Sequence, residues 1–117
     1  MTDYLGTPDY THGTPASTGV LLVNLGTPDE PTTSAVRRYL AEFLWDPRVI
    51  EQPRALWWLI LHGIILRTRP AKSAHAYQKV WTPAGSPLLV ESRALAGALG
   101  SRLRSRHGDR IRVELAM

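Results

Sequence analysis

Cysteine is absent from the 117-residue sequence, and its absence excludes several kinds of site. Without thiolates, the chain can build neither a disulfide framework nor an iron–sulfur or thiolate metal site. The sequence also has no unbroken apolar run of the ~20 residues that a bilayer span requires. Neither a G-x-G-x-x-G fingerprint nor a phosphate-binding P-loop occurs, so a nucleotide-binding function has little support.

The N-terminal residues 1–18 lack the features of an exported or an ordered segment. They contain neither a basic n-region nor an apolar h-region, so they do not resemble a secretory signal. Thr, Gly, Pro and Asp dominate, and there are too few aliphatic side chains to offset the entropy lost on ordering. We therefore predict a disordered tail over residues 1–18. A reducing cytoplasm is the expected location, since nothing points to an oxidising compartment.

The positive charge is concentrated in the second part of the chain. The sequence has 14 Lys and Arg residues against 10 Asp and Glu, a formal net charge of +4. Ten of those 14 cations lie from Arg67 onward, where only three acidic residues occur, Glu91, Asp109 and Glu114. Such a basic half can attract nucleic acid, anionic lipid or a carboxylate-bearing ligand, and charge alone does not choose among them.

Two apolar segments near the ends of the chain predict β-strands. Residues 19–25 form a nearly continuous apolar run, typical of a strand buried on both faces of a parallel sheet, and Gly26-Thr27-Pro28 ends it. Residues 111–117 alternate as a second strand would. Strand, helices and strand together indicate an α/β fold with one parallel crossover unit. Because two strands leave a sheet edge without a neighbour, the sequence is expected to be truncated after the second strand.

The segments between the strands have helical periodicity. A helix is expected from a cap at Thr33 or Ser34 to Asp46-Pro47, and Gly108 is expected to end the last helix, which begins near Pro87. Pro70 is expected to open a third helix. The segment from Pro53 to Leu66 is apolar almost all round and could be buried by a protein core, a ligand pocket or a membrane surface.

Several residues are candidates for ligand contact, each with a structural alternative. The turn Asn24 to Pro28 follows a buried strand, where open α/β sheets bind ligands, although it could be a plain connection. Arg67 and Arg69 follow the apolar segment and suit a carboxylate or phosphate, or else form a solvated helix end. Tyr77 and Ser86 could orient a carboxylate, or else serve as a core residue and a helix cap.

The four histidines do not indicate a metal site. His12, His62, His75 and His107 are not paired at metal-ligand spacing, and no Asp or Glu completes a cluster with them. We predict structural or exposed roles for all four and no metal ligands in this chain.

Five motifs follow one another along residues 19–117. They are G-V-L-L-V-N-L-G-T-P-D-E-P, A-V-R-R-Y-L-A-E-F-L-W-D-P-R-V-I, L-W-W-L-I-L-H-G-I-I-L, R-P-A-K-S-A-H-A-Y-Q-K-V-W and G-S-P-L-L-V. Their order, more than any one of them, resembles the N-terminal part of bacterial ferrochelatases. The resemblance implies a partial Rossmann-like, chelatase-type domain, the first of two similar halves with a porphyrin cleft between them.

This resemblance implies porphyrin contacts at four positions. Leu25, just before the glycine of the first turn, corresponds to the family residue that points at the macrocycle near the metal. The arginine, tyrosine and serine of the family's lip fall on Arg69, Tyr77 and Ser86, with Arg67 as a weaker alternative for the arginine. A porphyrin is an apolar disc with two propionates, so such a site needs apolar area beside cations and hydroxyls.

The implied activity is insertion of ferrous iron into protoporphyrin IX, or a close relative of it, to form protohaem. The family's metal-inserting histidine and glutamate have no match here, so the chain alone is expected to be inactive, with no catalytic residue and no bound cofactor. Ferrous iron is a substrate. The hydrophobic lip, about residues 53–70, could touch the membrane through Trp57–Leu66, which implies a cytoplasmic protein peripheral to the inner membrane.

Two other functions remain as alternatives. In the first, the apolar helix and the basic half bind a porphyrin or an anionic membrane without chemistry. The second, a nucleotide-binding fragment, lacks a phosphate loop, and no nucleic-acid partner is expected.

Overall fold

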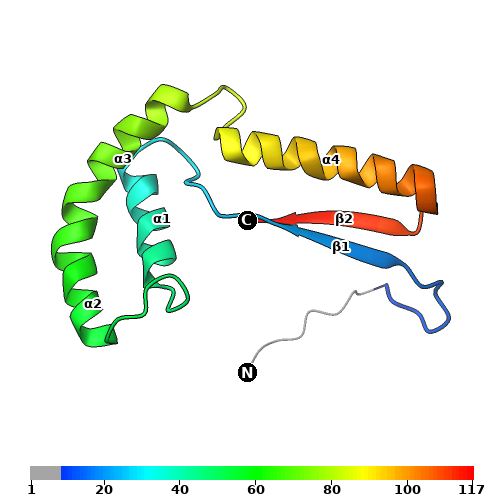
Figure 1. The fold of residues 1–117 in the computed structure, drawn as a ribbon, viewed down its shortest axis with the longest axis horizontal. Coiled ribbons are helices and arrows are strands. Elements are labelled where there is room, and N and C mark those ends of the chain that lie inside the picture. The colour runs from blue at the N-terminus through cyan, green and yellow to red at the C-terminus, as the bar shows by residue number, and fades with distance from the viewer. Residues whose placement is uncertain (1–8) are drawn as a thin grey trace.

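The structure, a computed structural model, describes residues 9–117, so residues 1–8 of the predicted tail lie outside it. Within residues 9–117, two parallel strands and four α-helices, with a π-helical turn between the second and third helices, make up an α/β arrangement (Figure 1). In chain order they are β1 (Thr18–Val23), α1 (Thr33–Trp45), α2 (Arg54–Ile60), the π-helix η1 (Leu61–Ile65), α3 (Leu66–Val80), α4 (Pro87–His107) and β2 (Ile111–Ala116).

These elements form two bodies. In one, α3 and η1 lie against α1, and in the other, α4 lies against β2 (Figure 1). The radius of gyration is 19.1 Å, well above the about 13 Å of a compact domain of this length. The chain therefore does not close around a single core.

The sheet consists of β1 and β2 in parallel, as predicted. Val20 pairs with Val113 and Leu22 with Leu115, and these residues are at least partly buried. The prediction that the first strand is buried on both faces is wrong, because Leu21 and Val23 are 65% and 67% exposed. Within the described residues, α4 is the helix that packs on the sheet, and one helix can cover one face only.

The ends of α1 and α4 follow local capping chemistry. The N-cap of α1 is Thr32, one residue before the predicted cap, and its hydroxyl accepts a hydrogen bond from the Ala35 amide at 3.3 Å. At the other end, Asp46 leaves the helical conformation before Pro47, as expected. Gly108 ends α4 with φ of 85°, a conformation that favours glycine.

The segment α2–η1–α3 is one continuous helical run with a buried stripe. Trp57, Leu61 and Leu66 form the core cluster, and Pro70 and Ala74 continue the buried side. The steps between these residues are four, five, four and four. A regular α-helix keeps residues four apart on one side, and the π-turn at Leu61–Ile65 accommodates the step of five.

The prediction that Pro70 opens a helix is wrong, because Pro70 lies inside α3. Proline cannot donate to the carbonyl four residues earlier, which belongs to Leu66. The Arg37 Nε on α1 donates to that carbonyl at 3.0 Å. A side chain from the neighbouring helix thus supplies the donor that proline lacks, and the helix continues.

We expect Arg37→Ala to destabilise the fold by about 1–2 kcal/mol, because the Leu66 carbonyl loses its donor beside a proline. Urea unfolding followed by circular dichroism measures this. The control is Arg38→Ala, since Arg38 makes an exposed ion pair with Asp29 at 3.3 Å and its loss should change stability by less than about 0.5 kcal/mol. Equal effects of the two substitutions would contradict the role given to Arg37.

Candidate functional site

The turn that follows β1 is held by Asn24. The Asn24 amide continues the sheet by donating to the Ala116 carbonyl at 3.0 Å. Its side-chain Nδ2 donates to the Ser92 hydroxyl of α4 at 3.0 Å, and its Oδ1 accepts from the Leu25 amide at 2.8 Å. Leu25 itself is 65% exposed. Asn24 therefore anchors the turn to the sheet and to α4, while the Leu25 side chain remains accessible to a ligand.

A crevice of about 620 Å³ lies beyond the carboxyl ends of both strands. It is lined by the Gly26-Thr27-Pro28 turn, by Met117 after β2, and by Tyr39 and Phe43 of α1, among others. This is where parallel sheets place ligands. Asp29, Glu42 and Asp46 also line it. Its rim is therefore more acidic than a dicarboxylate ligand would favour.

Tyr39 lines this crevice from α1, the helix that packs on α3. Its hydroxyl donates to the Gly26 carbonyl at 2.8 Å, and the ring stacks on Phe43 with centroids 5.7 Å apart. Burial raises the pKa of Tyr39 above 10.0, and the neighbouring Tyr77 raises it further. The hydroxyl therefore stays protonated and able to donate at neutral pH.

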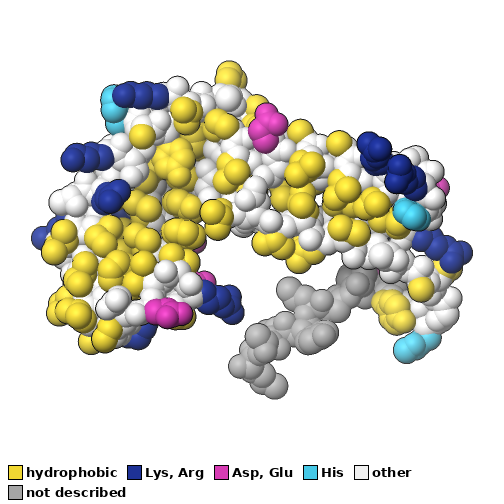
Figure 2. Space-filling view, in the orientation of Figure 1, with side chains coloured by type: hydrophobic (Ala, Val, Ile, Leu, Met, Phe, Trp, Pro, Cys, Tyr) yellow, Lys and Arg dark blue, Asp and Glu magenta, His cyan; other side chains and the backbone are white. Residues whose placement is uncertain are grey.

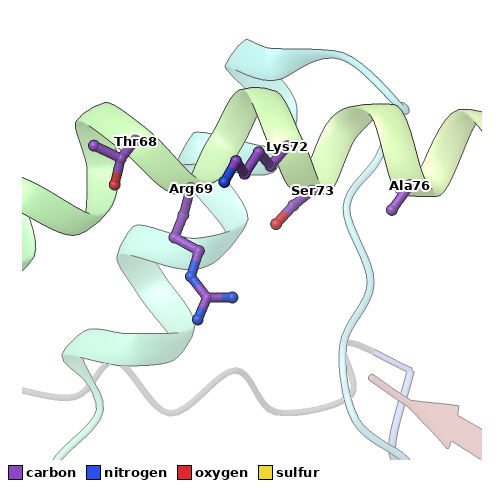
Figure 3. Close-up of a pocket in the computed structure, with 5 residues that line it drawn as sticks. All are labelled: Thr68, Arg69, Lys72, Ser73 and Ala76. Carbon is purple, nitrogen blue, oxygen red and sulfur yellow. The ribbon is translucent and has the colours of Figure 1, made fainter.

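Three adjoining hollows form a groove along α3, here called the α3 groove. The largest, about 500 Å³, is lined by Thr68, Arg69, Lys72, Ser73 and Ala76 (Figure 3). A second, about 270 Å³, joins Arg69 and Ser73 to an apolar wall of Leu40, Leu44, Trp57 and Ile65. A third, also about 270 Å³, runs from Ser73 past Tyr77 to Val80. Ser73 lines all three, so the hollows adjoin one another at this residue.

The structure brings two of the four predicted contacts into this groove. Arg69 lies exposed at one part of it, and half-buried Tyr77 lies at another, edge-on to Trp81 with ring centroids 6.2 Å apart. Arg67 is exposed and lines none of the hollows described here. Between the two candidate arginines, the geometry favours Arg69.

Leu25 and Ser86 lie outside the α3 groove. Leu25 adjoins Gly26 of the crevice, and the Gly26 carbonyl accepts the Tyr39 hydrogen bond. Ser86 is 2% exposed, and its Oγ accepts from the Leu89 amide at 3.2 Å as the N-cap of α4. Its capping alternative is thus confirmed, and a ligand contact for this buried hydroxyl stays a prediction.

Tyr39, Lys72 and Ser73 line the crevice and the groove but were not among the candidates predicted from the sequence. The signal for the last two was present, because they follow Arg69 by three and four positions and so share its side of a helix. No comparable signal marks Tyr39. Its importance comes from a hydrogen bond to a residue 13 positions away, which the sequence does not show.

Two further features concern membranes and metals. None of the helices in residues 9–117 is both long enough and apolar enough to cross a bilayer. Within the same residues, no three His, Cys, Asp or Glu side chains gather as a metal ion would need.

A comparison with protein families matches residues 17–117 to the model of the family described as Ferrochelatase. The chain belongs to the ferrochelatase family. It is 60% identical over 112 residues to the ferrochelatase of Thioalkalivibrio sulfidiphilus, 56% over 114 residues to that of Marinobacter nauticus, and 65% over 105 residues to that of Shewanella denitrificans. These matches cover 96%, 97% and 86% of this chain, and 30%, 31% and 31% of the respective relatives.

The chain therefore spans about 30% of the length of these curated ferrochelatases. No solved structure gives a significant match. The α/β arrangement with parallel strands agrees with a partial chelatase-type fold.

Proposed function

We propose that this chain supplies porphyrin-binding surface to a ferrochelatase, which inserts ferrous iron into protoporphyrin IX to form protohaem. The α3 groove is the observation that carries the proposal. Its apolar wall of Leu40, Leu44 and Trp57 stands beside Arg69 and Ser73. A flat apolar ring can lie on the wall while its carboxylates reach the cation and the hydroxyl.

Lys72 and Tyr77 extend this match. Lys72 lines the same hollow as Arg69, so two cations are available for a dianionic ligand (Figure 3). Tyr77 adds a phenol farther along the groove. Because these cations lie on the solvated side of α3, they orient the ligand more than they hold it, and the apolar wall supplies most of the affinity.

Iron insertion requires chemical groups that the α3 groove does not contain. Inserting Fe²⁺ releases the two pyrrole N–H protons of the macrocycle, so a base must accept them. The resemblance assigns that base to a histidine with a glutamate partner in a motif that this sequence lacks. We propose that the present chain contributes binding and orientation, with iron as a substrate, and that it is inactive alone.

A membrane contact is a second part of the proposal. Leu56, Trp58, Leu59 and Ile64 are exposed on the α2–η1 segment, on the side away from the core cluster. Figure 2 shows apolar side chains concentrated over the half of the molecule that contains this segment. Such a surface, with Arg67 nearby, fits a peripheral protein that takes up a poorly soluble porphyrin at the cytoplasmic side of the inner membrane.

Arg69→Ala should weaken porphyrin binding by about fivefold, because one exposed charge-assisted contact is worth about 1 kcal/mol. Fluorescence titration of the 117-residue chain with protoporphyrin IX measures it. Arg67→Ala is the matched control and should leave the affinity unchanged. If Arg67→Ala weakens binding and Arg69→Ala does not, the contact belongs to Arg67 instead.

Iron insertion needs a longer protein for its test. In a chimera, the residues of the Thioalkalivibrio sulfidiphilus ferrochelatase that match this chain are replaced by this sequence. We expect the chimera to metallate protoporphyrin IX, followed by the loss of porphyrin fluorescence, and the 117-residue chain alone to show no turnover. A folded chimera that binds porphyrin without inserting iron would favour a non-catalytic binding module.

Flotation with anionic vesicles tests the membrane contact. Leu59→Ser should reduce the vesicle-bound fraction severalfold, because Leu59 is 61% exposed on the proposed contact surface. Leu95→Ser on α4, where Leu95 is 56% exposed, is the control and should bind as the parent chain does. Equal binding of both variants would remove this surface from the proposal. Salt sensitivity of the binding reports the share contributed by cations.

A further inference from the structure

Tyr39 occupies the junction between the turn after β1 and helix α3. Its hydroxyl donates to the Gly26 carbonyl at 2.8 Å, across 13 residues of sequence. The ring lies so close to the turn that a Cβ at Gly26 would be 3.2 Å from its Cε2 atom. Phe43 stacks on the ring with planes only 13° apart. The ring and the hydroxyl are therefore held at the same time, and both contact the turn that carries Leu25.

Helix α1, which carries Tyr39, packs on α3. Burial is the larger cause that raises the pKa of Tyr39, and Tyr77 of α3 is the smaller one. One residue on, the Gln78 Nε2 donates to the Pro31 carbonyl at 3.0 Å, a second connection between α3 and the segment before α1. The Gln78 hydrogen bond and the packing of α1 on α3 thus set the position of this segment relative to the α3 groove.

We propose that Tyr39 is a positioning residue of the porphyrin site: through the Gly26 carbonyl it fixes the Leu25–Thr27 backbone against the end of the α3 groove that contains Tyr77. This inference rests on the proposed porphyrin-binding function. Tyr39 acts through the turn, and needs no contact of its own with the macrocycle. A tyrosine with a merely structural role would stabilise α1 without affecting how a bound porphyrin is oriented.

Tyr39→Phe tests the proposal, because it removes the hydroxyl and keeps the ring that packs on Phe43. In the 117-residue chain we expect the Kd for protoporphyrin IX to rise about three- to tenfold, the range expected for one hydrogen bond. At saturation, the Soret maximum of the bound porphyrin should shift, and amide hydrogen exchange should accelerate at residues 25–27 but not along α1. Tyr10→Phe, the same change at an exposed residue outside the site, should alter none of these.

A second variant approaches the same contact from the turn. Gly26→Ala places a methyl group 3.2 Å from a ring that Phe43 and the hydrogen bond hold in place. We expect it to shift the Soret maximum as Tyr39→Phe does. Two variants that change opposite sides of one contact and move one spectroscopic band would support positioning.

The outcomes separate this inference from the proposed function. If Tyr39→Phe leaves the Kd, the Soret maximum and the exchange of residues 25–27 unchanged while Arg69→Ala weakens binding, the positioning role is overturned and porphyrin binding stands. Accelerated exchange throughout α1 with an unmoved Soret maximum would show a structural role and also overturn it. If Arg69→Ala and Tyr77→Phe leave binding unchanged as well, the porphyrin site itself fails.

Discussion

The buried stripe from Trp57 to Ala74 determines how α3 lies on α1, and the α3 groove depends on that orientation. A helix that buries Leu66, Pro70 and Ala74 must present the adjacent stripe, with Arg69 and Ser73, at the edge of the helix contact. The π-turn accommodates the five-residue step between Leu61 and Leu66. If the segment between Leu61 and Leu66 had one residue fewer and no π-turn, Trp57 and Leu66 would be eight positions apart. A regular α-helix would then keep both residues on the same side.

Pro70 shows how this arrangement tolerates a residue that normally interrupts a helix. Its ring occupies a fully buried position, and the carbonyl left without an intrahelical donor receives the Arg37 side chain. The helix pair is thereby joined by a hydrogen bond as well as by apolar packing. Arg69, directly before Pro70, is exposed at the edge of that contact, where the groove is open to solvent.

The two bodies of the molecule contribute different parts of the proposed site. The helical body of α1, η1 and α3 carries the apolar wall and the cations. The sheet body contributes the turn with Leu25, which Asn24 secures to α4. Tyr39 connects the two bodies. Its ring belongs to the helical body, and its hydroxyl donates to the Gly26 carbonyl of the turn. A ligand that used both bodies would depend on that contact.

Local sequence was sufficient for the elements whose signals are local. The two strands, the ending of α1 before Pro47 and the glycine stop of α4 were all predictable, because caps, prolines and apolar periodicity act within a few residues. The position of Thr32 as cap was missed by one residue among adjacent Thr and Ser side chains with equal capping ability. Arg69 and Tyr77 were predicted as contacts from motif order, and helical spacing could have added Lys72 and Ser73, which line the same groove.

The remaining features required the tertiary structure. The sequence cannot show that Arg37 supplies the donor that Pro70 lacks, or that Tyr39 donates to the Gly26 carbonyl. Nor can it show that Ser86 is buried in its capping role. Each of these features depends on an interaction or on burial that only the folded chain creates. The exposure of Leu21 and Val23 likewise depends on which elements cover the sheet. The apolar sequence of a strand does not show whether one face of the strand is covered or both. The sequence by itself determined the family, the two strands, the ending of α1 and the glycine stop of α4. The packing of α3 on α1 and of α4 on the sheet decided which candidate residues share a surface, because contacts between distant segments are properties of the folded chain.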